Sequence, residues 1–310
     1  MSGQGQSALK HRIKLGTVLP HRAVQPIPPQ LPGRIARRAE ALGFADLWVT
    51  ENTLDHAFCL DPMVALSHAA ACTSRIRLGV SVVVLPTHNP IHVAHQTLSL
   101  DHLSEGRAML AVGIGRPQHY AEFQVPTARR VRRFNEAVAV IRALWQNPVA
   151  DYQGEIFELH GANMGIRPVQ QPTPPLWMGG GHPDAVRRAA RLADGWMGAG
   201  SQDSQAFAEC VPILRAALSE AGRDPAGFTV SKRVFMAVDD KPARARAMLH
   251  RWFTEVYRTE KQTDSAGVYG TPEQVREQLE ALVEAGAEHL VLNLVDDYEA
   301  QLEALVGIIG

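Results

Sequence analysis

Three consecutive glycines, Gly179, Gly180 and Gly181, stand between an apolar run and a helical pattern that begins at Pro183. Backbone amides at such a turn, together with the positive end of a helix dipole, suit a phosphate group. The alternative is a tight turn that needs glycine for a positive φ angle. No Gly-Lys-Ser/Thr sequence follows, so the stretch is not a Walker-type P-loop. We favour phosphate binding, because turns after the late strands of α/β barrels often bind phosphate.

A second pair of glycines, Gly113 and Gly115, ends another apolar run and is followed by Arg116 and His119. The spacing is not Gly-x-Gly-x-x-Gly, so it does not indicate a Rossmann-type dinucleotide site. Glycines at a strand end let a flat or bulky ligand approach the backbone, and a simple loop is the alternative.

One hydroxyl interrupts a run of β-branched residues, because Ser81 lies between Val80 and Val82. Strands that are buried on both faces are typically continuous apolar runs. The serine therefore either bonds to a neighbouring carbonyl or marks a place where the strand meets a ligand.

The sequence gives little support for a metal site or for a nucleophilic catalytic residue. His88, His92 and His95 are close in sequence, but Pro90 follows His88 and no His-Glu-x-x-His motif occurs. We expect no metal site. The sequence also lacks the nucleophile-elbow and kinase signatures. The chemistry is therefore expected to come from a bound organic cofactor.

Apolar runs alternate with helical patterns from one end of the chain to the other. Such runs, separated by helices, predict a parallel sheet covered on both faces, and eight of them favour a TIM (β/α)8 barrel over residues 1–310 as a single domain. The expected strands span 13–20, 44–50, 75–86, 107–115, 175–180, 194–200, 228–238 and 289–295. Insertions are expected after strand four, as a hairpin within 149–160, and after strand seven, as a polar and mobile excursion over 255–270. In such a barrel the active site lies at the carboxyl ends of the strands.

The composition excludes several classes of protein. The net charge of the 310 residues is −1, which indicates neither a nucleic-acid partner nor a membrane surface. The sequence has no apolar run of about 18 residues. Cys59, Cys72 and Cys210 are far apart, which favours a reducing cytoplasm over a disulfide framework. Asp101 and Arg107 are expected to form a structural pair across a turn at the bottom of the barrel.

Four longer stretches carry a resemblance to the luciferase-like monooxygenase superfamily. These are ALGFADLWVTEN, TSRIRLGVSVVVLPTHNP, LDHLSEGRAMLAVGIG and PPLWMGGGHPDAVRRAARLADGW. Members of this superfamily are TIM barrels that use flavin mononucleotide (FMN) or the deazaflavin coenzyme F420. The resemblance implies a bulge with a non-prolyl cis peptide behind the central ring of the cofactor, and Ser81-Val82 matches that place. It also implies that the triple glycine lies near the cofactor phosphate and that the strand end at Gly113–Gly115 lines the ring or its polar chain.

The sequence departs from the F420-dependent sugar-phosphate dehydrogenases of this superfamily. Those enzymes have an Asp-His pair at the end of strand two and a glutamate after strand four, whereas Glu51-Asn52 and Arg116 occupy these places here. Their substrate and proton-transfer scheme is therefore not carried over. Asn52 and Arg116 become catalytic candidates by position, and His56 or His119, on adjacent loops, is the candidate to replace the missing acid.

Three functions follow from the resemblance. The first is an oxidoreductase that transfers a hydride between a small organic substrate and F420, which the Arg- and Ala-rich composition favours as typical of high-GC genomes. The second is an FMN-dependent monooxygenase, and the third is a non-catalytic cofactor-binding protein. We also expect a homodimer in the cytoplasm.

Overall fold

Eight parallel strands close into a barrel in the computed structural model, which describes residues 9–116 and 120–310. The strands are hydrogen-bonded in this order around the ring, and the last pairs with the first: β1 (Lys14–Val18), β3 (Asp46–Val49), β5 (Arg77–Val84), β6 (Ala108–Gly113), β9 (Leu176–Gly179), β10 (Gly195–Gly198), β11 (Thr229–Val238) and β13 (His289–Leu294). The predicted TIM barrel is confirmed.

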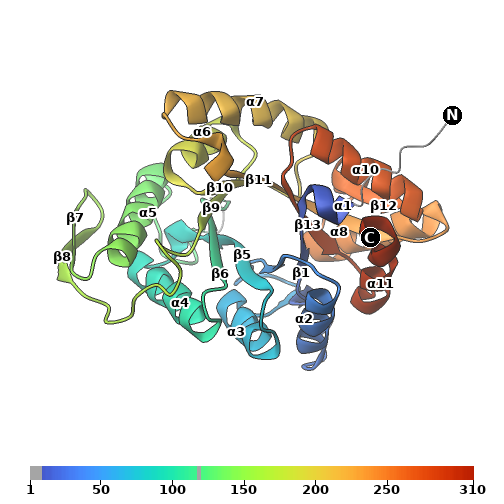
Figure 1. The fold of residues 1–310 in the computed structure, drawn as a ribbon, viewed down its shortest axis with the longest axis horizontal. Helices are drawn as coiled ribbons and strands as arrows, with labels where there is room; N and C mark the ends of the chain where they lie inside the picture. The colour runs from blue at the N-terminus through green and yellow to red at the C-terminus, as the bar shows by residue number, and fades with distance from the viewer. Residues whose placement is uncertain (1–8, 117–119) are drawn as a thin grey trace.

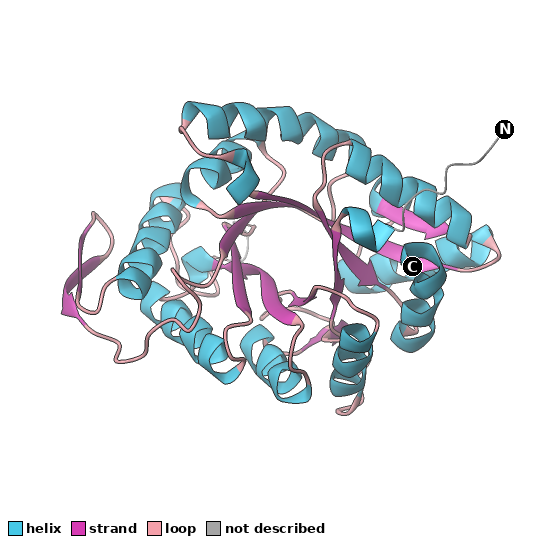
Figure 2. Cartoon of the chain, viewed as in Figure 1, coloured by secondary structure: helices cyan, strands magenta, loops and turns pink. Residues whose placement is uncertain are grey.

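Helices surround the barrel on its outside (Figures 1 and 2). Their bounds are α1 (Leu9–Arg12), α2 (Leu31–Ala41), α3 (Pro62–Cys72), α4 (Pro90–Leu103), α5 (Arg130–Gln146), α6 (Pro183–Leu192), α7 (Ser204–Glu220), α8 (Pro242–Tyr257), α9 (Gln262–Ala266), α10 (Pro272–Glu284) and α11 (Tyr298–Ile309). Two helix starts follow the sequence signals directly. The side chains of Asp61 and Asn89 accept hydrogen bonds from the first turns of α3 and α4, and each is followed by a proline, which needs no hydrogen-bond acceptor there.

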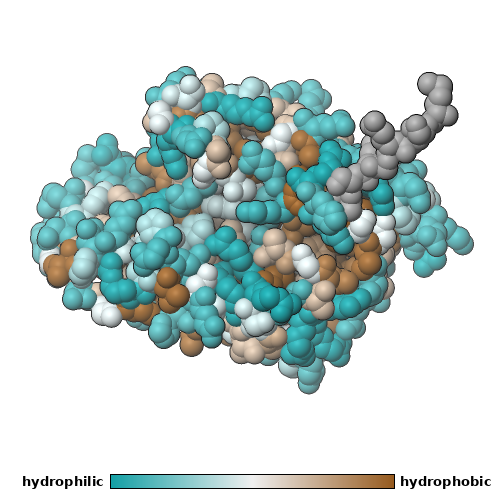
Figure 3. All heavy atoms as spheres, viewed as in Figure 1, coloured by the Kyte–Doolittle hydropathy of each residue, from teal (hydrophilic) through white to brown (hydrophobic). Residues whose placement is uncertain are grey.

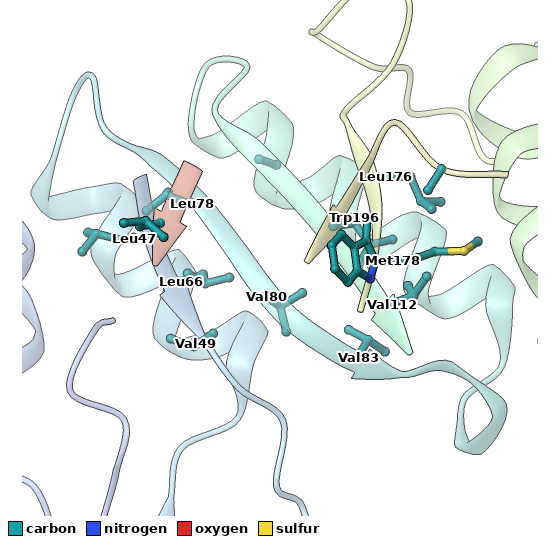
Figure 4. Close-up of a cluster of buried hydrophobic side chains, with 14 of the residues drawn as sticks. Leu47, Val49, Leu66, Leu78, Val80, Val83, Val112, Leu176, Met178 and Trp196 are labelled. Carbon is teal, nitrogen blue, oxygen red and sulfur yellow. The ribbon is translucent and has the colours of Figure 1, made fainter. Parts of the chain in front are cut away.

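The main core fills the space between the barrel strands and the helices. Figure 4 shows part of it, with Val80 and Val83 of β5, Val112 of β6, Met178 of β9 and Trp196 of β10. A smaller cluster, which includes Trp48 and Trp177, draws only on strand residues and therefore lies inside the barrel. Figure 3 shows that the molecular surface facing the viewer is mainly hydrophilic, with scattered apolar residues.

Both predicted insertions are present, but the second differs from the expectation. After β6 and α5, β7 (Ala150–Gln153) and β8 (Glu158–Ala162) form the expected hairpin. After β11, the stretch 255–270 is not an irregular excursion: it contains the end of α8, α9 and β12 (Gly267–Gly270). β12 pairs with the far end of β11, so its backbone groups are satisfied by extending the sheet.

The predicted pair between Asp101 and Arg107 is wrong. Asp101 is fully buried and accepts hydrogen bonds from the backbone N–H groups of Val169 and Gln170. Arg107 donates instead to backbone carbonyls at the end of α3 and just after it, including Ala70. Both side chains hold loops in place, because unpaired backbone groups there would be costly to bury.

Three short elements complete the fold. β2 (Arg22–Ala23) and β4 (Phe58–Cys59) pair as an antiparallel ribbon between the loops that follow β1 and β3. Two single turns of 3₁₀ helix span Leu85–Thr87 and Pro225–Gly227. Within the described ranges, none of the helices has the length and apolar character needed to cross a membrane.

Candidate active site

Three adjoining cavities open at the carboxyl ends of the barrel strands. We call them the mouth, glycine and outer cavities, with volumes of about 310, 400 and 360 Å³. The mouth cavity is lined by residues that include Asn52, Ser81, Val82, Gly113, Gly179, Arg233, Phe235 and Tyr257. The glycine cavity is lined by residues that include Arg130, Phe134, Gly180, Gly181, His182 and Arg188. The outer cavity is lined by residues that include Arg22, Glu51, Asn52, Asp55, His56, Arg116, Phe123, Tyr257 and Arg258.

The cavities form one continuous site rather than three separate ones. Gly115 lines all of them. Asn52 belongs to both the mouth and outer cavities, and Gly180 belongs to both the mouth and glycine cavities. The structure therefore brings together every described residue that the sequence placed in the site. His119 lies outside the described residues.

The peptide bond between Ser81 and Val82 is cis, as predicted, and the pairing of β5 with β6 shifts at this point. Ser81 lines the mouth cavity and is 6% exposed. Among the described residues its hydroxyl has no hydrogen-bond partner, so the alternative of a serine bonded to a neighbouring carbonyl is wrong. A buried hydroxyl without a partner is unfavourable, so this atom fits a site that a polar ligand completes.

The glycines around the mouth make room for a neighbouring side chain. A Cβ atom on Gly113 would lie 2.7 Å from a methyl group of Val82, and a Cβ on Gly179 would lie 2.6 Å from the other methyl group. These distances are too short for two carbon atoms that are not bonded to each other. The two glycines therefore make room for the Val82 side chain, and both also line the mouth cavity themselves.

The triple glycine forms a tight turn in which only part of the backbone is free for a ligand. Gly180 has a φ angle of +148°, which favours glycine, and its N–H donates to the carbonyl of Met197 at 3.2 Å. Its own carbonyl accepts from the indole of Trp196 at 2.7 Å. The amide of Gly180 is thus used within the barrel, which leaves Gly181 as the glycine at the start of α6 whose amide suits a phosphate.

Two arginines that the sequence analysis did not single out supply positive charge to the glycine cavity. Arg130 and Arg188 both line it, against the single carboxylate of Asp184. Arg188 is 9% exposed and lies over the ring of Phe134 at 5.8 Å. Burial, and then the charge of Arg191, lower the pKa of Arg188. A buried guanidinium beside a helix N-terminus fits an anionic group such as a phosphate.

A hydrogen-bonded chain fixes the orientation of Asn52. Its side-chain N–H donates to the hydroxyl of Thr50 at 2.9 Å, and that hydroxyl is 2.8 Å from Nε2 of His21. Nε2 also accepts from the N–H of Thr50, so Nδ1 carries the proton and donates to the carbonyl of Leu19 at 2.7 Å. His21 is neutral, because burial lowers its pKa to about 4. The chain leaves the amide oxygen of Asn52 as the group that can meet a ligand.

The unfolding free energy is expected to depend on pH through His21. In the unfolded chain His21 binds its proton near pH 6.5, whereas in the folded chain it does so only near pH 4. Stability should therefore fall by about 3 kcal/mol as the pH falls through this window, at about 1.4 kcal/mol per pKa unit. Urea unfolding at a series of pH values measures this slope. His21→Gln should flatten it and the exposed-residue control His160→Gln should not, whereas an unchanged slope in His21→Gln would rule out His21 as its source.

Glu51 is occupied in holding the loops together. Its carboxylate accepts from the N–H of Val84 at 2.9 Å and contacts Nε2 of His88 at 2.9 Å. Burial lowers the pKa of His88, but the hydrogen bond and charge of Glu51, together with the charge of Asp61, outweigh burial and raise it. The pair therefore ties the end of β3 to the end of β5.

The other two catalytic candidates lie at the outer cavity. His56 has its Nε2 2.9 Å from the carbonyl of Glu255 and its Nδ1 3.0 Å from a carboxylate oxygen of Asp55. Its side chain is 31% exposed, so it remains in reach of solvent. Arg116 is exposed and lines both the outer and mouth cavities.

Several residues of the site were missed by the sequence analysis. Arg22 follows β1, and Arg233 and Phe235 lie within β11. Tyr257 ends α8 and lines both the mouth and outer cavities. A signal existed for Arg233, because two adjacent cations at Lys232-Arg233 are unusual inside an apolar strand. Tyr257 lies far along an insertion, and its sequence context gives no such signal.

A family comparison agrees with the fold. A model of the family described as luciferase-like monooxygenase matches residues 13–289. The chain belongs to this family. Among its relatives, an F420-dependent glucose-6-phosphate dehydrogenase from Kineococcus radiotolerans is 30% identical over 71% of this chain and 68% of that enzyme. A phthiodiolone/phenolphthiodiolone dimycocerosates ketoreductase from Mycobacterium tuberculosis is 31% identical over 62% of this chain, but the match spans only 50% of that protein.

Solved structures that share this fold include an F420-dependent enzyme and an FMN-bound enzyme. An F420-dependent secondary alcohol dehydrogenase in complex with an F420-acetone adduct superimposes with a TM-score of 0.83 at 21% identity, covering 96% of this chain and 98% of that one. The FMN-bound oxygenating constituent of a Baeyer-Villiger monooxygenase from Pseudomonas putida superimposes with a TM-score of 0.77 at 18% identity, covering 96% and 98%. At these identities the likeness concerns the fold.

Proposed function

We propose that this family member is an oxidoreductase that transfers a hydride between a small organic substrate and coenzyme F420. The observation that carries the proposal is the continuous site: the mouth cavity joins the cationic glycine cavity on one side and the outer cavity on the other. This arrangement suits a flat ring with an attached phosphate, and leaves space for a substrate beside the ring. The F420-dependent relative at 30% identity favours F420 over FMN. When bound, F420 supplies the hydride-accepting or hydride-donating ring carbon.

In this proposal the protein binds and orients the two reactants. The hydroxyl of Ser81 and the side chain of Val82 form the wall behind the ring, which leaves the opposite face for the substrate. Gly113 and Gly179 shape the space around Val82, and Gly115 shapes the space around Val84, beside the cofactor chain. The amide of Gly181 and the guanidinium of Arg188 hold the phosphate. The site suits these roles because the backbone groups lie at or near the carboxyl ends of barrel strands, and Arg188 reaches the glycine cavity from α6.

At the substrate side, the amide of Asn52 orients the substrate oxygen, because the chain from His21 through Thr50 fixes it. His56 exchanges the proton of the substrate with solvent once its Nε2 releases the carbonyl of Glu255, and Arg116 lies beside both reactants. His119 lies outside the described residues and stays a prediction from the sequence, as a cofactor-binding residue or as the replacement acid. A hydrogen bond positioned in this way lowers the reorganisation needed during the reaction.

A turnover assay tests this function. The protein with oxidised F420 is mixed with a panel of alcohols, and the absorbance of oxidised F420 is followed with and without oxygen. We expect loss of absorbance with at least one alcohol class at the same rate in both conditions, because hydride transfer consumes no oxygen. Oxygen consumption with reduced FMN, without any turnover of F420, would instead identify the monooxygenase.

The organisation of the protein is also part of the proposal. We propose a single domain over residues 1–310, a homodimer, and a cytoplasmic location without nucleic-acid partners. The closed ring of strands supports a single domain, and the widely spaced free cysteines support the cytoplasm. Sedimentation equilibrium tests the dimer, and a single cooperative unfolding transition tests the single domain.

A further inference from the structure

The outer cavity carries an excess of positive charge. Arg22, Arg116 and Arg258 line it, against the two carboxylates of Glu51 and Asp55. The carboxylate of Glu51 is already held by a backbone N–H and a histidine, as described above. Arg116 and Arg258 form no ion pair within the described ranges. A cavity with this charge favours an anionic ligand.

Arg22 is the most constrained of these cations. It is 6% exposed, its Nε donates to Asp55 at 2.7 Å, and its Nη2 donates to the carbonyl of Val256 at 3.0 Å. Its guanidinium carbon lies 4.4 Å from the ring centre of Tyr257. One edge of the guanidinium is therefore fixed by the protein. Its Nη1 is buried and, over residues 9–116 and 120–310, has no hydrogen-bond partner.

An unpaired donor on a buried cation is unfavourable, so a ligand oxygen at Nη1 would complete the arrangement. The position of Arg22 decides which ligand this is. Arg22 lines the outer cavity, and it is absent from the linings of the mouth and glycine cavities within the described chain. The group that it meets therefore belongs to the substrate and not to the cofactor.

We propose that the substrate carries a carboxylate, which accepts hydrogen bonds from Nη1 of Arg22 in the outer cavity. This inference deepens the proposed function and rests on it for the identity of the reaction. Three arginines against two carboxylates leave the cavity with a net charge of about +1, which one carboxylate balances and a doubly charged phosphate exceeds. The remaining wall includes Leu54, Val84 and Phe123, which suit a hydrocarbon chain between the carboxylate and the reacting carbon. The substrate class is thus a hydroxy acid or the corresponding oxo acid.

Matched substrates test the proposal. The F420-loaded protein is assayed with a secondary alcohol that ends in a carboxylate, and with the same alcohol ending in a methyl ester or a phosphate. We expect kcat/KM for the carboxylate to exceed that for the ester by about tenfold or more, the effect of a hydrogen bond to a charged group. Equal values for the two, or a higher value for the phosphate, would overturn the proposal.

Variants of Arg22 assign the preference to one side chain. In Arg22→Gln the preference for the carboxylate over the ester should fall to about onefold, while the affinity for F420 stays within about twofold. The control Arg37→Gln removes an exposed arginine from α2 and should keep the full preference. An undiminished preference in Arg22→Gln would overturn the assignment. If Arg22→Gln does not fold, Arg22→Lys keeps the charge but not the planar fork, and should lower the preference at least partly.

A binding measurement separates this inference from the proposed cofactor. The hydroxy acid alone is titrated into the apoprotein by calorimetry, for the wild type and Arg22→Gln. Binding that depends on Arg22 supports the carboxylate site even if the protein does not bind F420, in which case only the proposed function fails. Equal binding by both proteins, or none by either, overturns the carboxylate site.

Discussion

Gly179→Ala is expected to weaken the binding of F420 by about a hundredfold, the binding equivalent of an overpacking cost near 3 kcal/mol. The new Cβ would lie 2.6 Å from a methyl group of Val82, so the valine must move. The space on the Gly113 side of the Val82 side chain is equally tight. Val82 can therefore move only toward the mouth cavity, where the ring of the cofactor is proposed to lie. Fluorescence titration with F420 measures the change in affinity.

A second substitution identifies the cause of this loss. Val82→Ala removes the methyl groups that the new Cβ meets, so the double variant Gly179→Ala/Val82→Ala should recover most of the lost affinity. The control Gly307→Ala adds a Cβ where nothing lies within 4 Å and should bind F420 normally. If the double variant binds no better than Gly179→Ala, the loss does not come from Val82.

Arg188→Met is expected to weaken F420 binding by about ten- to a hundredfold, the range for a hydrogen bond to a charged group. The methionine fills similar space over Phe134 but carries no charge. The stability of the protein without cofactor should be unchanged or higher, because a buried cation is removed. Calorimetric titration with F420, together with thermal unfolding of the apoprotein, measures both effects.

The control for this variant lies on the same helix. Arg191→Met removes an exposed arginine of α6, and should leave the affinity close to that of the wild type. Unchanged affinity in Arg188→Met would place the phosphate away from the glycine cavity. A loss of affinity accompanied by a large loss of stability would instead mean that Arg188 holds the fold.

The barrel could be predicted from the sequence because each strand is a continuous apolar run with a helical pattern after it. The helix starts at Asp61 and Asn89 are readable from the Asp-Pro and Asn-Pro pairs themselves, because capping is a local property. The stretch 255–270 was misjudged for the opposite reason. Its local sequence is polar, and β12 forms because its backbone finds a partner at the far end of β11.

The site was only partly predictable for similar physical reasons. Gly113 and Gly179 could be located from the ends of apolar runs and Ser81 from its interruption of one, but the space over the glycines is taken by Val82, which is a packing property. The amide of Gly180 is used by Met197, a pairing between strands that local sequence does not reveal. Arg22 meets residues of α8 more than two hundred positions away, so only the fold brings it to the cavity.

The affinity of the apoprotein for F420, compared with its affinity for FMN in the same buffer, tests the central claim most directly. Quenching of cofactor fluorescence gives both dissociation constants. We predict a micromolar or lower dissociation constant for F420 and a value at least about tenfold higher for FMN, a difference of about 1.4 kcal/mol. Equal affinities, or tighter binding of FMN, would contradict the assignment of this protein as an F420-dependent oxidoreductase.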